Sequence, residues 1–490
     1  MCPSLALIYA REMSGPAPAQ PLLPGLESYE LSSTCYDEAL AAPMTARPHY
    51  ARLLEGLAGT DLTALTRATE EAVDRRGVRF RGRSGDVPFK LDPIPRIFTR
   101  EEWEGLALGA VQRARALNSF AADAYGEQRI VGAGRIPARV LEMADHFEPA
   151  MAGVEVPSGI YAGVLGLDLV RDSDGELKVL EDNARTPSGL AYAQAALAAI
   201  DDVLPLDPGS RLDGEDRWSV LAEVLRAAAP DNVDEPAIAL VSDGPENSAW
   251  WEHEQIASAL DIPIVTLSDL ELRDDRLYAR VEGSRRRLDV VYRRTDEDRV
   301  LDDSGNVTPW AEAILPPLRA GRLGCVNTPG AGIADDKLVH AYVEEMIRFY
   351  LDEEPLLASV KTYDLAEPAQ RAECIDRIDE MVIKPRTGHG GHGVIICAHA
   401  RPEDLERAAR QIEAEPESFA AQELVAISRH PTVQGSELRP RHVDLRPFVM
   451  SAGERVVTLP GGLTRVAFVA GALVVNSSQD GGAKATWVLR

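Results

Sequence analysis

Cysteine is scarce in this chain and follows no pattern. Five cysteines occur in 490 residues, and no two of them form a C-x-x-C pair. Disulfide frameworks and structural zinc sites need paired cysteines at short spacings, so neither is expected, and a reducing cytoplasm is the predicted compartment. His389 and His392 add no metal site, because no third candidate ligand lies near them in the sequence. The cysteines are Cys2, Cys35, Cys325, Cys374 and Cys397.

Long apolar runs and positive charge are also lacking. No run approaches the roughly 20 apolar residues of a membrane-spanning helix. Lys and Arg total 52 against 78 Asp and Glu, which gives a net charge of −26. Nucleic acid is therefore not an expected partner, since its binding needs a basic face. ATP is not excluded in the same way, because a few placed cations and metal ions can hold its phosphates.

The length and composition predict a globular protein with more than one domain. Apolar residues make up 45% of the chain and charged residues 27%, as in ordinary globular proteins, and 490 residues exceed what one core usually supports. The proline-rich residues 1–30 are expected to be a disordered extension or a misassigned start, with Met13 as an alternative initiator. Strands at 236–242 and 262–267 around a helix at 247–260 predict a small parallel α/β unit.

Two longer helices follow from local signals. Thr99 precedes Glu101 and Glu102, which is typical of a helix start, and the apolar spacing continues to about Tyr125. A second helix is predicted from Asp335 to Tyr350.

A glycine cluster between two apolar stretches is the strongest signal for function. Lys384 and Pro385 end the first stretch, and residues 394–396 begin the second. The glycines match G-x-G-x-x-G, but that dinucleotide motif needs a helix after its third glycine, and a strand is predicted here. A glycine loop between strands can close over a triphosphate, because backbone N–H groups can approach phosphate; an ordinary glycine-rich hairpin is the alternative. The loop glycines are Gly388, Gly390, Gly391 and Gly393.

A predicted hairpin brings three oxygen donors together. A turn at residues 172–175 joins two strands, and strand alternation places Asp168 near Glu181 and Asn183. Two carboxylates and an amide oxygen suit Mg²⁺, which completes its coordination with phosphate and water. A solvated polar face is the alternative, and the neighbouring glycine loop favours the metal site.

Two further groups fit a nucleotide site. Asp335 and Asp336 suit a helix N-terminus, whereas Lys337 does not, and such a cation marks either a bound anion or a plain surface lysine. About 30 residues beyond the glycine loop, a strand carries a polar pair within an apolar run. Strands in nucleotide clefts commonly offer backbone groups to adenine. Its residues are Gln422, Glu423, Leu424 and Val425.

Taken together, these parts resemble the circularly permuted ATP-grasp family (type 2), which is related to the synthetase domain of glutathionylspermidine synthetase. In ordinary ATP-grasp proteins the metal ligands follow the glycine loop, whereas here they precede it. The resemblance extends from about Tyr36 to Trp487. The matching stretches are residues 36–38, 117–120, 125–129, 180–189, 291–295, 334–337, 442–448 and 476–479.

The resemblance implies a mixed α/β (α+β) fold, circularly permuted ATP-grasp, with the nucleotide between two α/β subdomains. One domain is expected over 31–490, with 230–330 as a parallel subdomain and 335–430 as the glycine-loop subdomain. The implied roles are Mg²⁺ binding for Asp168, Glu181 and Asn183 (two ions, with Glu181 bridging), phosphate contacts for Lys337 and Lys384, phosphate coverage by the 388–393 loop, and an adenine hinge at 422–425.

One departure concerns the arginine that faces the transferred phosphate. In the glutathionylspermidine enzymes it stands two positions before the first metal carboxylate, where this chain has Gly166. Arg185, Arg294 or Arg465 could replace it, and the sequence does not choose among them. Arg446 or Arg465 is the expected contact for a substrate carboxylate, since arginine binds carboxylate in a bidentate manner.

The implied activity is formation of an amide or peptide bond from a small carboxylate and an amine, such as an amino acid, peptide or polyamine. ATP activates the acid as an acyl phosphate, and ADP and phosphate are released. The alternatives are a phosphotransferase with the same fold and an inactive nucleotide-binding scaffold. A nicotinamide oxidoreductase is disfavoured, because no helix follows the glycine motif.

Overall fold

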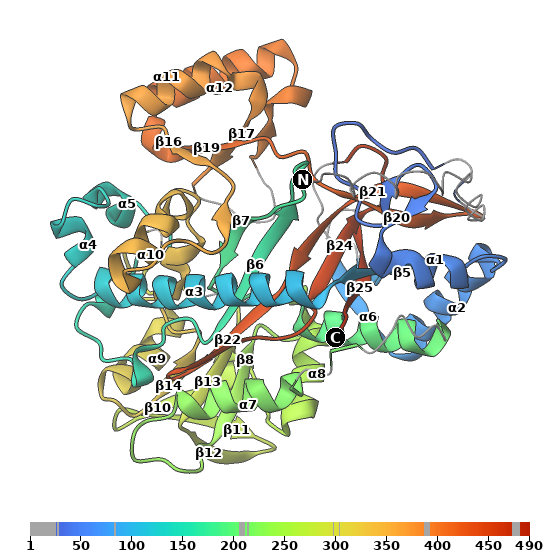
Figure 1. Ribbon diagram of the computed structural model, residues 1–490. Coiled ribbons are helices and arrows are strands. Elements are labelled where there is room, and N and C mark those ends of the chain that lie inside the picture. The colour runs from blue at the N-terminus through green and yellow to red at the C-terminus, as the bar shows by residue number, and fades with distance from the viewer. Residues whose placement is uncertain are drawn as a thin grey trace, which may run out of the picture.

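A mixed sheet of ten strands forms the centre of the protein, and its neighbouring strands come from distant parts of the chain. The computed structural model describes Leu26 and residues 29–82, 85–204, 211–212, 215–296, 298–302, 304–386, 393–472 and 481–490. The sheet order is β15-β7-β6-β21-β24-β25-β5, with β20 paired to β21 and β22 paired to β6 and β23. C-terminal strands thus lie between the β6–β7 hairpin and the N-terminal β5 (Figure 1). The strands are β5 (Leu91–Phe98), β6 (Val164–Arg171), β7 (Leu177–Asn183), β15 (Ala358–Ser359), β20 (Arg429–Gln434), β21 (Glu437–Arg446), β22 (Phe448–Ala452), β23 (Arg455–Thr458), β24 (Leu463–Ala467) and β25 (Gly481–Val488).

The long helix α3 (Arg100–Ala124) crosses one face of this sheet (Figure 1). It begins where the sequence predicts: the Thr99 side chain accepts a hydrogen bond from Glu102 N (3.2 Å), and the Glu102 carboxylate accepts one from Thr99 N (3.0 Å). Its apolar side, which includes Trp103, Leu117 and Phe120, lies in the largest core cluster. The capping box determines where this helix begins, and the apolar stripe determines which side packs against the sheet.

Replacing Thr99 by alanine is expected to destabilise the protein by about 1 kcal/mol, because the first turn of α3 loses its side-chain cap. Urea unfolding measures this change. Thr66→Ala is the matched control: Thr66 lies inside α2 (Leu62–Arg75) and bonds back to Leu62 O, so alanine there should leave stability unchanged or slightly higher. Equal losses in both variants would contradict a contribution from the cap.

A four-stranded parallel sheet, in the order β14-β13-β8-β9, forms a second layer below the large sheet in Figure 1. The strands and the helix predicted between 236 and 267 are observed in this layer. A three-stranded antiparallel sheet, β10-β11-β12, packs against it, and the buried side chains of the two sheets form one core cluster. The elements are β8 (Ile238–Ser242), α8 (Trp250–Leu260), β9 (Ile264–Val265), β10 (Leu270–Arg273), β11 (Arg276–Val281), β12 (Ser284–Leu288), β13 (Val290–Arg294), α9 (Pro309–Arg319) and β14 (Gly324–Val326).

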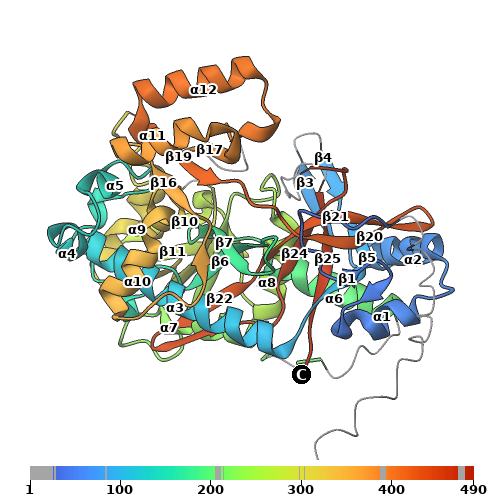
Figure 2. The same cartoon turned by 45° about the horizontal axis from the view of Figure 1, so that its top comes forward.

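A small antiparallel subdomain, residues 362–423, stands at one end of the large sheet (Figures 1 and 2). Its sheet order is β16-β19-β17-β18, and two helices cover its outer face. It has its own core, which includes Tyr363, Met381, Ile383 and Ala421. The elements are β16 (Thr362–Asp364), α11 (Pro368–Asp376), β17 (Met381–Pro385), β18 (Ile395–Ile396), α12 (Pro402–Ala414) and β19 (Phe419–Glu423).

The predicted helix from Asp335 to Tyr350 is wrong in its first half. Residues 331–335 and 339–342 form short 3-10 helices, and α10 begins only at Val343. The Asp336 carboxylate accepts hydrogen bonds from Leu338 N (2.8 Å) and Val339 N (3.2 Å) and also pairs with Arg386. Such side-chain bonds to the backbone compete with helix formation, so this stretch becomes a turn that directs Lys337 toward the large sheet.

The remaining elements complete the layers around the large sheet. Two described residues of the predicted N-terminal extension contact the protein: Leu26 is buried, and Tyr29 donates a hydrogen bond to Asp37 (2.6 Å). The elements are β1 (Leu40–Ala42), β2 (Thr45–Ala46), α1 (Ala51–Gly56), α2 (Leu62–Arg75), β3 (Arg79–Gly82), β4 (Gly85–Pro88), α4 (Arg129–Gly132), α5 (Ala138–Glu142), α6 (Leu190–Val203), α7 (Arg217–Ala227) and α10 (Val343–Leu351).

Candidate functional site

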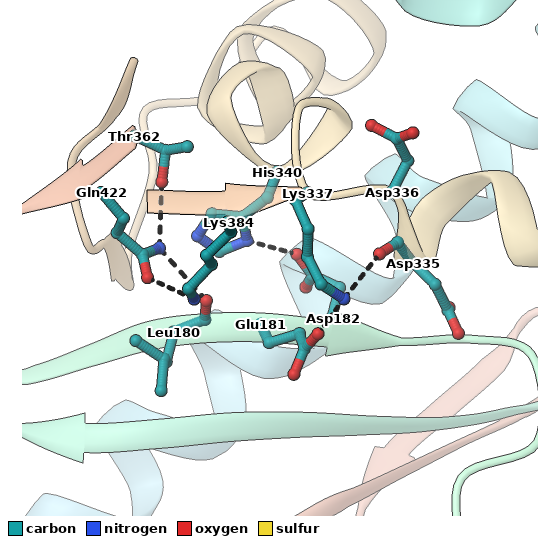
Figure 3. A pocket seen from close by; sticks show the side chains of 10 residues that line it. All are labelled: Leu180, Glu181, Asp182, Asp335, Asp336, Lys337, His340, Thr362, Lys384 and Gln422. Atoms are coloured by element: carbon teal, nitrogen blue, oxygen red, sulfur yellow. Dashed lines mark hydrogen bonds and ion pairs between the residues drawn. The ribbon is translucent and has the colours of Figure 1, made fainter. Parts of the chain in front are cut away.

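A small pocket lies where β7 of the large sheet meets the turn before α10 and the antiparallel subdomain (Figure 3). Its empty volume is about 240 Å³, part of which is open to solvent. The lining residues are Leu180, Glu181, Asp182, Asp335, Asp336, Lys337, His340, Thr362, Lys384 and Gln422.

Two lysines from different parts of the chain enter this pocket. Lys384 lies on β17, and its ammonium donates to Gln422 Oε1 at 2.6 Å. Lys337 comes from the turn before α10 and forms an ion pair with Glu181. The chain has only six lysines against 46 arginines, so finding two of the six lysines in one pocket is unusual. A compact ammonium can contact phosphate as a point charge, and its pKa responds to burial.

The electrostatics of the pocket differ between the two lysines. Burial lowers the pKa of Lys384 to about 8, against the opposing influence of Glu181. For Lys337 burial acts in the same direction, but the adjacent Glu181 carboxylate prevails and raises its pKa. Burial acts to raise the pKa of Glu181, but Lys337 and Lys384 together lower it. Lys384 is therefore the lysine without a carboxylate partner at hydrogen-bond distance, and its charge is available for an anionic ligand.

The β6–β7 hairpin places the three predicted oxygen donors as expected from strand alternation. Asp168 lies directly opposite Glu181, and Gly166 lies opposite Asn183, with an irregularity in the register after Asp168. Glu181 lines the pocket. The Asn183 Nδ2 atom is buried and has no hydrogen-bond partner among the described residues.

The donors are compatible with a magnesium site in their chemistry. They are hard oxygens on rigid neighbouring strands; the buried atom of Asn183 without a partner is the amide nitrogen, which is a hydrogen-bond donor and not a metal ligand. Both carboxylates carry cations: Asp168 is paired with Arg446 and Arg465, and Glu181 with Lys337. Over the described ranges, no group of three or more His, Cys, Asp and Glu side chains is arranged to hold a metal ion, so any such site depends on the amide and on ligand oxygens.

Asp168 is held more tightly than the sequence suggested. Arg446 binds it in a bidentate manner (2.6 and 2.8 Å), and Arg465 Nη2 lies 2.8 Å from it and also pairs with Asp444. Burial alone would raise the pKa of Asp168, but the two guanidinium groups hold it well below its ordinary value. A charged Asp168 is therefore maintained at any physiological pH.

The position of Arg446 gives a physical reason for glycine at 166. A Cβ atom on Gly166 would lie 2.9 Å from Pro187 Cβ and 3.3 Å from Arg446 Cδ. The Arg446 side chain thus fills the space in front of Gly166, two residues before Asp168 on the same face of β6. An arginine from the C-terminal strand β21 thus lies in front of Gly166, the position at which the glutathionylspermidine enzymes have their arginine.

The other arginines predicted from the sequence lie apart from the pocket lining. Arg185 contacts His146 Nε2 (2.9 Å) and Asp298 (3.4 Å). Arg294 donates to Pro187 O (2.8 Å) and to Ser188 Oγ (2.7 Å) below the start of α6. The structure brings Arg446 and Arg465, but neither of these two, onto Asp168.

The strand predicted as an adenine hinge borders the pocket through Gln422. Its amide accepts from Lys384 and donates to Leu180 O (3.2 Å) and Thr362 Oγ1 (3.0 Å). Glu423 faces away and accepts from Tyr363 (2.9 Å). Leu424 N donates to Glu380 O (2.9 Å), and Val425 is buried.

The glycine loop lies mostly outside the described residues. Gly388, Gly390 and Gly391 lie outside the described residues, between 386 and 393, and the matching stretch 476–479 lies outside them as well, between 472 and 481. Gly393 is described, with φ +75°, a conformation that favours glycine. Before the gap, Arg386 pairs with Asp336 (3.1 Å) and donates to Val140 O (3.0 Å). The root of the loop is thereby anchored next to Lys337.

Sequence reasoning missed a buried network behind Glu181. Asp182 accepts two hydrogen bonds from Arg113 of α3 (2.6 and 2.7 Å), and His340 Nδ1 lies 2.8 Å from it. Asp182 lies between Glu181 and Asn183, so alternation turns it to the other face of the strand, toward the core. A buried carboxylate requires a cation, so the position of Asp182 in the strand could have predicted a buried ion pair. Its partners could not be named, because they lie 69 and 158 residues away.

Within the part of the chain that is described, no helix is long and apolar enough to cross a membrane.

Comparisons with known proteins identify the family and the fold. The sequence matches the family described as circularly permuted ATP-grasp type 2 over residues 95–467. A protein of Frankia casuarinae, provisionally named glutamate–cysteine ligase 2-2, is 41% identical over 477 residues, which are 95% of this chain and 55% of that protein. The chain therefore spans about half the length of this relative. An uncharacterized protein of Synechocystis is 38% identical over 480 residues, which are 95% of this chain and 99% of that protein.

A solved structure supports the fold. The apo form of a glutathione synthetase-like effector from Globodera pallida superposes with a TM-score of 0.55 at 14% identity, over 87% of this chain and 97% of that chain. At this identity the likeness concerns the fold alone. The expected mixed α/β architecture is thus confirmed, and the chain belongs to the circularly permuted ATP-grasp type 2 family.

Proposed function

We propose that the protein is an ATP-dependent carboxylate–amine ligase that forms an amide or peptide bond. The observation that carries this proposal is the meeting of Lys337 and Lys384 with Glu181 in one pocket between β7 and the antiparallel subdomain. Membership of the ATP-grasp family and the provisional ligase name of the Frankia relative support it. The carboxylate and amine substrates are small molecules, such as an amino acid, a peptide or a polyamine.

The reaction has two steps. A carboxylate oxygen of the first substrate attacks the γ-phosphorus of ATP, the bond from that phosphorus to the β–γ bridging oxygen breaks, and ADP leaves. The nitrogen of the amine then attacks the acyl carbon, the carbon–oxygen bond to phosphate breaks, and phosphate leaves as the amine loses a proton. The first step brings two anions together, so fixed positive charge is the principal requirement.

The chain supplies that charge from both sides of the pocket. Lys384 and Lys337 would contact the phosphates, and the 388–393 loop would exclude water from the acyl phosphate, which otherwise hydrolyses. Asp168, Glu181 and Asn183 would hold Mg²⁺. When bound, Mg²⁺ neutralises charge on the phosphoryl oxygens.

Two arginines are placed to serve the substrate end. Among Arg185, Arg294 and Arg465, it is Arg465 that contacts Asp168, so we assign it the role of facing the transferred phosphoryl group. Arg446 lies next to it with its bidentate face on Asp168, and we assign it the substrate carboxylate, which it would contact through the N–H groups that Asp168 does not use.

The test uses purified protein with magnesium-ATP and pools of small carboxylates and amines. A productive pair should release ADP and phosphate in equal amounts together with the coupled product. Hydroxylamine in place of the amine should give a hydroxamate, which traps the acyl phosphate. A phosphorylated product without phosphate release would instead indicate a phosphotransferase.

The pH dependence of ATP binding follows from Lys384. Its ammonium form carries the charge, and burial lowers its pKa to about 8, so the charge is present below pH 8 and lost above it. ATP affinity is expected to fall about tenfold between pH 7 and pH 9, because the charged fraction of Lys384 falls by that factor. Calorimetric titration at a series of pH values measures this.

Lys384→Arg is the matched control, since a guanidinium stays charged throughout this range. Its pH profile should be flat between 7 and 9. An unchanged tenfold fall in this variant would assign the titration to another group.

A further inference from the structure

The imidazole of His340 is fixed in one orientation at the wall of the pocket. Asp182 binds its Nδ1 (2.8 Å) and is itself held by two bonds from Arg113. The side chains of Asp182 and Arg113 are 0% and 1% exposed, so this network is closed to water. His340 itself is 4% exposed.

This network also selects the tautomer of His340. A carboxylate oxygen only accepts hydrogen bonds, so Nδ1 must carry the hydrogen that it donates to Asp182. Arg113 Nη2 lies 3.1 Å from the same nitrogen, but a bare lone pair on Nδ1 would repel the carboxylate at 2.8 Å. In the neutral ring the lone pair therefore resides on Nε2.

The Nε2 atom is the unusual feature. It is buried and makes no hydrogen bond within the described part of the chain, although His340 lines the pocket. Figure 3 shows the ring with one nitrogen toward Asp182 and the other toward Lys384 and Gln422. Burial lowers the pKa of His340 below its ordinary value, with a contribution from the nearby cations, which keeps the ring neutral. A buried acceptor without a partner is costly and therefore rare.

A neutral acceptor cannot serve the phosphates, because its lone pair repels their oxygens. Two neighbouring donors are engaged: Gln422 Nε2 donates to Leu180 O and Thr362 Oγ1, and the Thr362 hydroxyl donates to Val360 O. The Lys384 ammonium donates to Gln422 Oε1, and its remaining hydrogens are the ones proposed above for phosphate. The pocket thus offers two cations, Lys337 and Lys384, and an acceptor, His340 Nε2. A nucleotide has the complementary chemistry, since its phosphates accept and its nucleoside donates.

We propose that His340 Nε2 accepts a hydrogen bond from the nucleoside part of the bound nucleotide, either a ribose hydroxyl or the adenine amine. Asp182 and Arg113 act through His340 as positioning residues, because they hold the ring and its tautomer. The inference rests on the nucleotide site proposed above and adds a residue that reads the nucleoside.

Two variants test the two ring nitrogens of His340 separately. His340→Asn keeps a nitrogen where Nδ1 bonds Asp182 but removes the acceptor at Nε2. His340→Gln places an amide oxygen near Nε2 and gives up the bond to Asp182. By calorimetry with magnesium-ATP, we expect His340→Asn to bind about tenfold more weakly and His340→Gln to bind more tightly than His340→Asn. His399→Asn, at an exposed histidine, should bind as the wild type does.

Ligand analogues identify the donor and its location. Magnesium tripolyphosphate, which has no nucleoside, should bind equally to wild type and His340→Asn. Among 2′-deoxy-ATP, 3′-deoxy-ATP and purine riboside triphosphate, the analogue without the critical donor should lose about tenfold with wild type and nothing further with His340→Asn, as expected for directly coupled groups. The analogue that behaves in this way distinguishes hydroxyl from amine.

Each other outcome overturns the inference. Unchanged ATP affinity in a folded His340→Asn variant refutes it alone, as does an equal loss of tripolyphosphate, which would make His340 a phosphate contact. If His340→Asn does not fold, the analogue series with wild type and His340→Gln decides, and equal binding of all analogues to wild type refutes the inference. A wild-type protein that binds no ATP refutes the proposed function as well.

Discussion

Replacing Lys384 by methionine is expected to lower ATP-dependent turnover by about 100- to 1,000-fold while the protein stays folded. Its ammonium is the less compensated of the two pocket cations, since Gln422 is a neutral partner and burial lowers its pKa to about 8. Loss of a preorganised charge at a phosphoryl group typically has an effect of this size. Methionine keeps the apolar stem, and the Lys337–Glu181 pair remains intact. Turnover is measured as ADP release and folding as the thermal midpoint.

Lys178→Met is the matched control for this substitution. Lys178 lies on β7 near the turn of the β6–β7 hairpin and pairs with Asp172. It shares its strand with Glu181 but is not among the pocket residues. Turnover in this variant should match the wild type. Full activity in Lys384→Met would remove Lys384 from the site, and equal losses in both variants would indicate a general effect on the fold.

The second large effect is expected from Glu181→Gln. The substitution keeps size and hydrogen bonding but removes the charge that faces Lys337 and the predicted metal position. Turnover should fall at least about 100-fold, and the magnesium concentration that half-saturates the reaction should rise. Steady-state rates across a magnesium titration at fixed ATP measure both changes.

Glu176→Gln, at an exposed position of the same hairpin, serves as the control and should leave the magnesium curve unchanged. A Glu181→Gln variant with the wild-type magnesium curve would exclude Glu181 as a ligand. Because Lys337 would lose its only charged partner on β7, a modest fall in stability is expected as well.

Features set by neighbouring residues were predictable from the sequence. The start of α3 follows from Thr99 and Glu102, which interact across one helical turn. The pairing of Asp168 with Glu181 follows from a short turn and strand alternation. Lys384 could be placed in the site because it precedes the glycine loop directly. In each case the deciding interaction spans few residues, so local rules suffice.

Features set by distant contacts were not predictable. The sequence around Asp168 does not indicate that it pairs with Arg446 and Arg465, which lie on C-terminal strands 278 and 297 residues away. Asp335 to Lys337 were placed at a helix start, because the bond of Asp336 to Arg386 is invisible in the local pattern. The same holds for His340, whose role depends on Asp182 and Arg113 together. Tertiary contacts overrode propensity at these positions.

The most direct test of the proposed chemistry follows one oxygen atom. With a carboxylate substrate labelled with ¹⁸O in its carboxyl group, a ligase that forms an acyl phosphate must transfer one labelled oxygen to each released phosphate. Mass spectrometry of the phosphate should therefore show one ¹⁸O atom per turnover. Unlabelled phosphate from a reaction that yields the coupled product would contradict activation of the carboxylate by ATP.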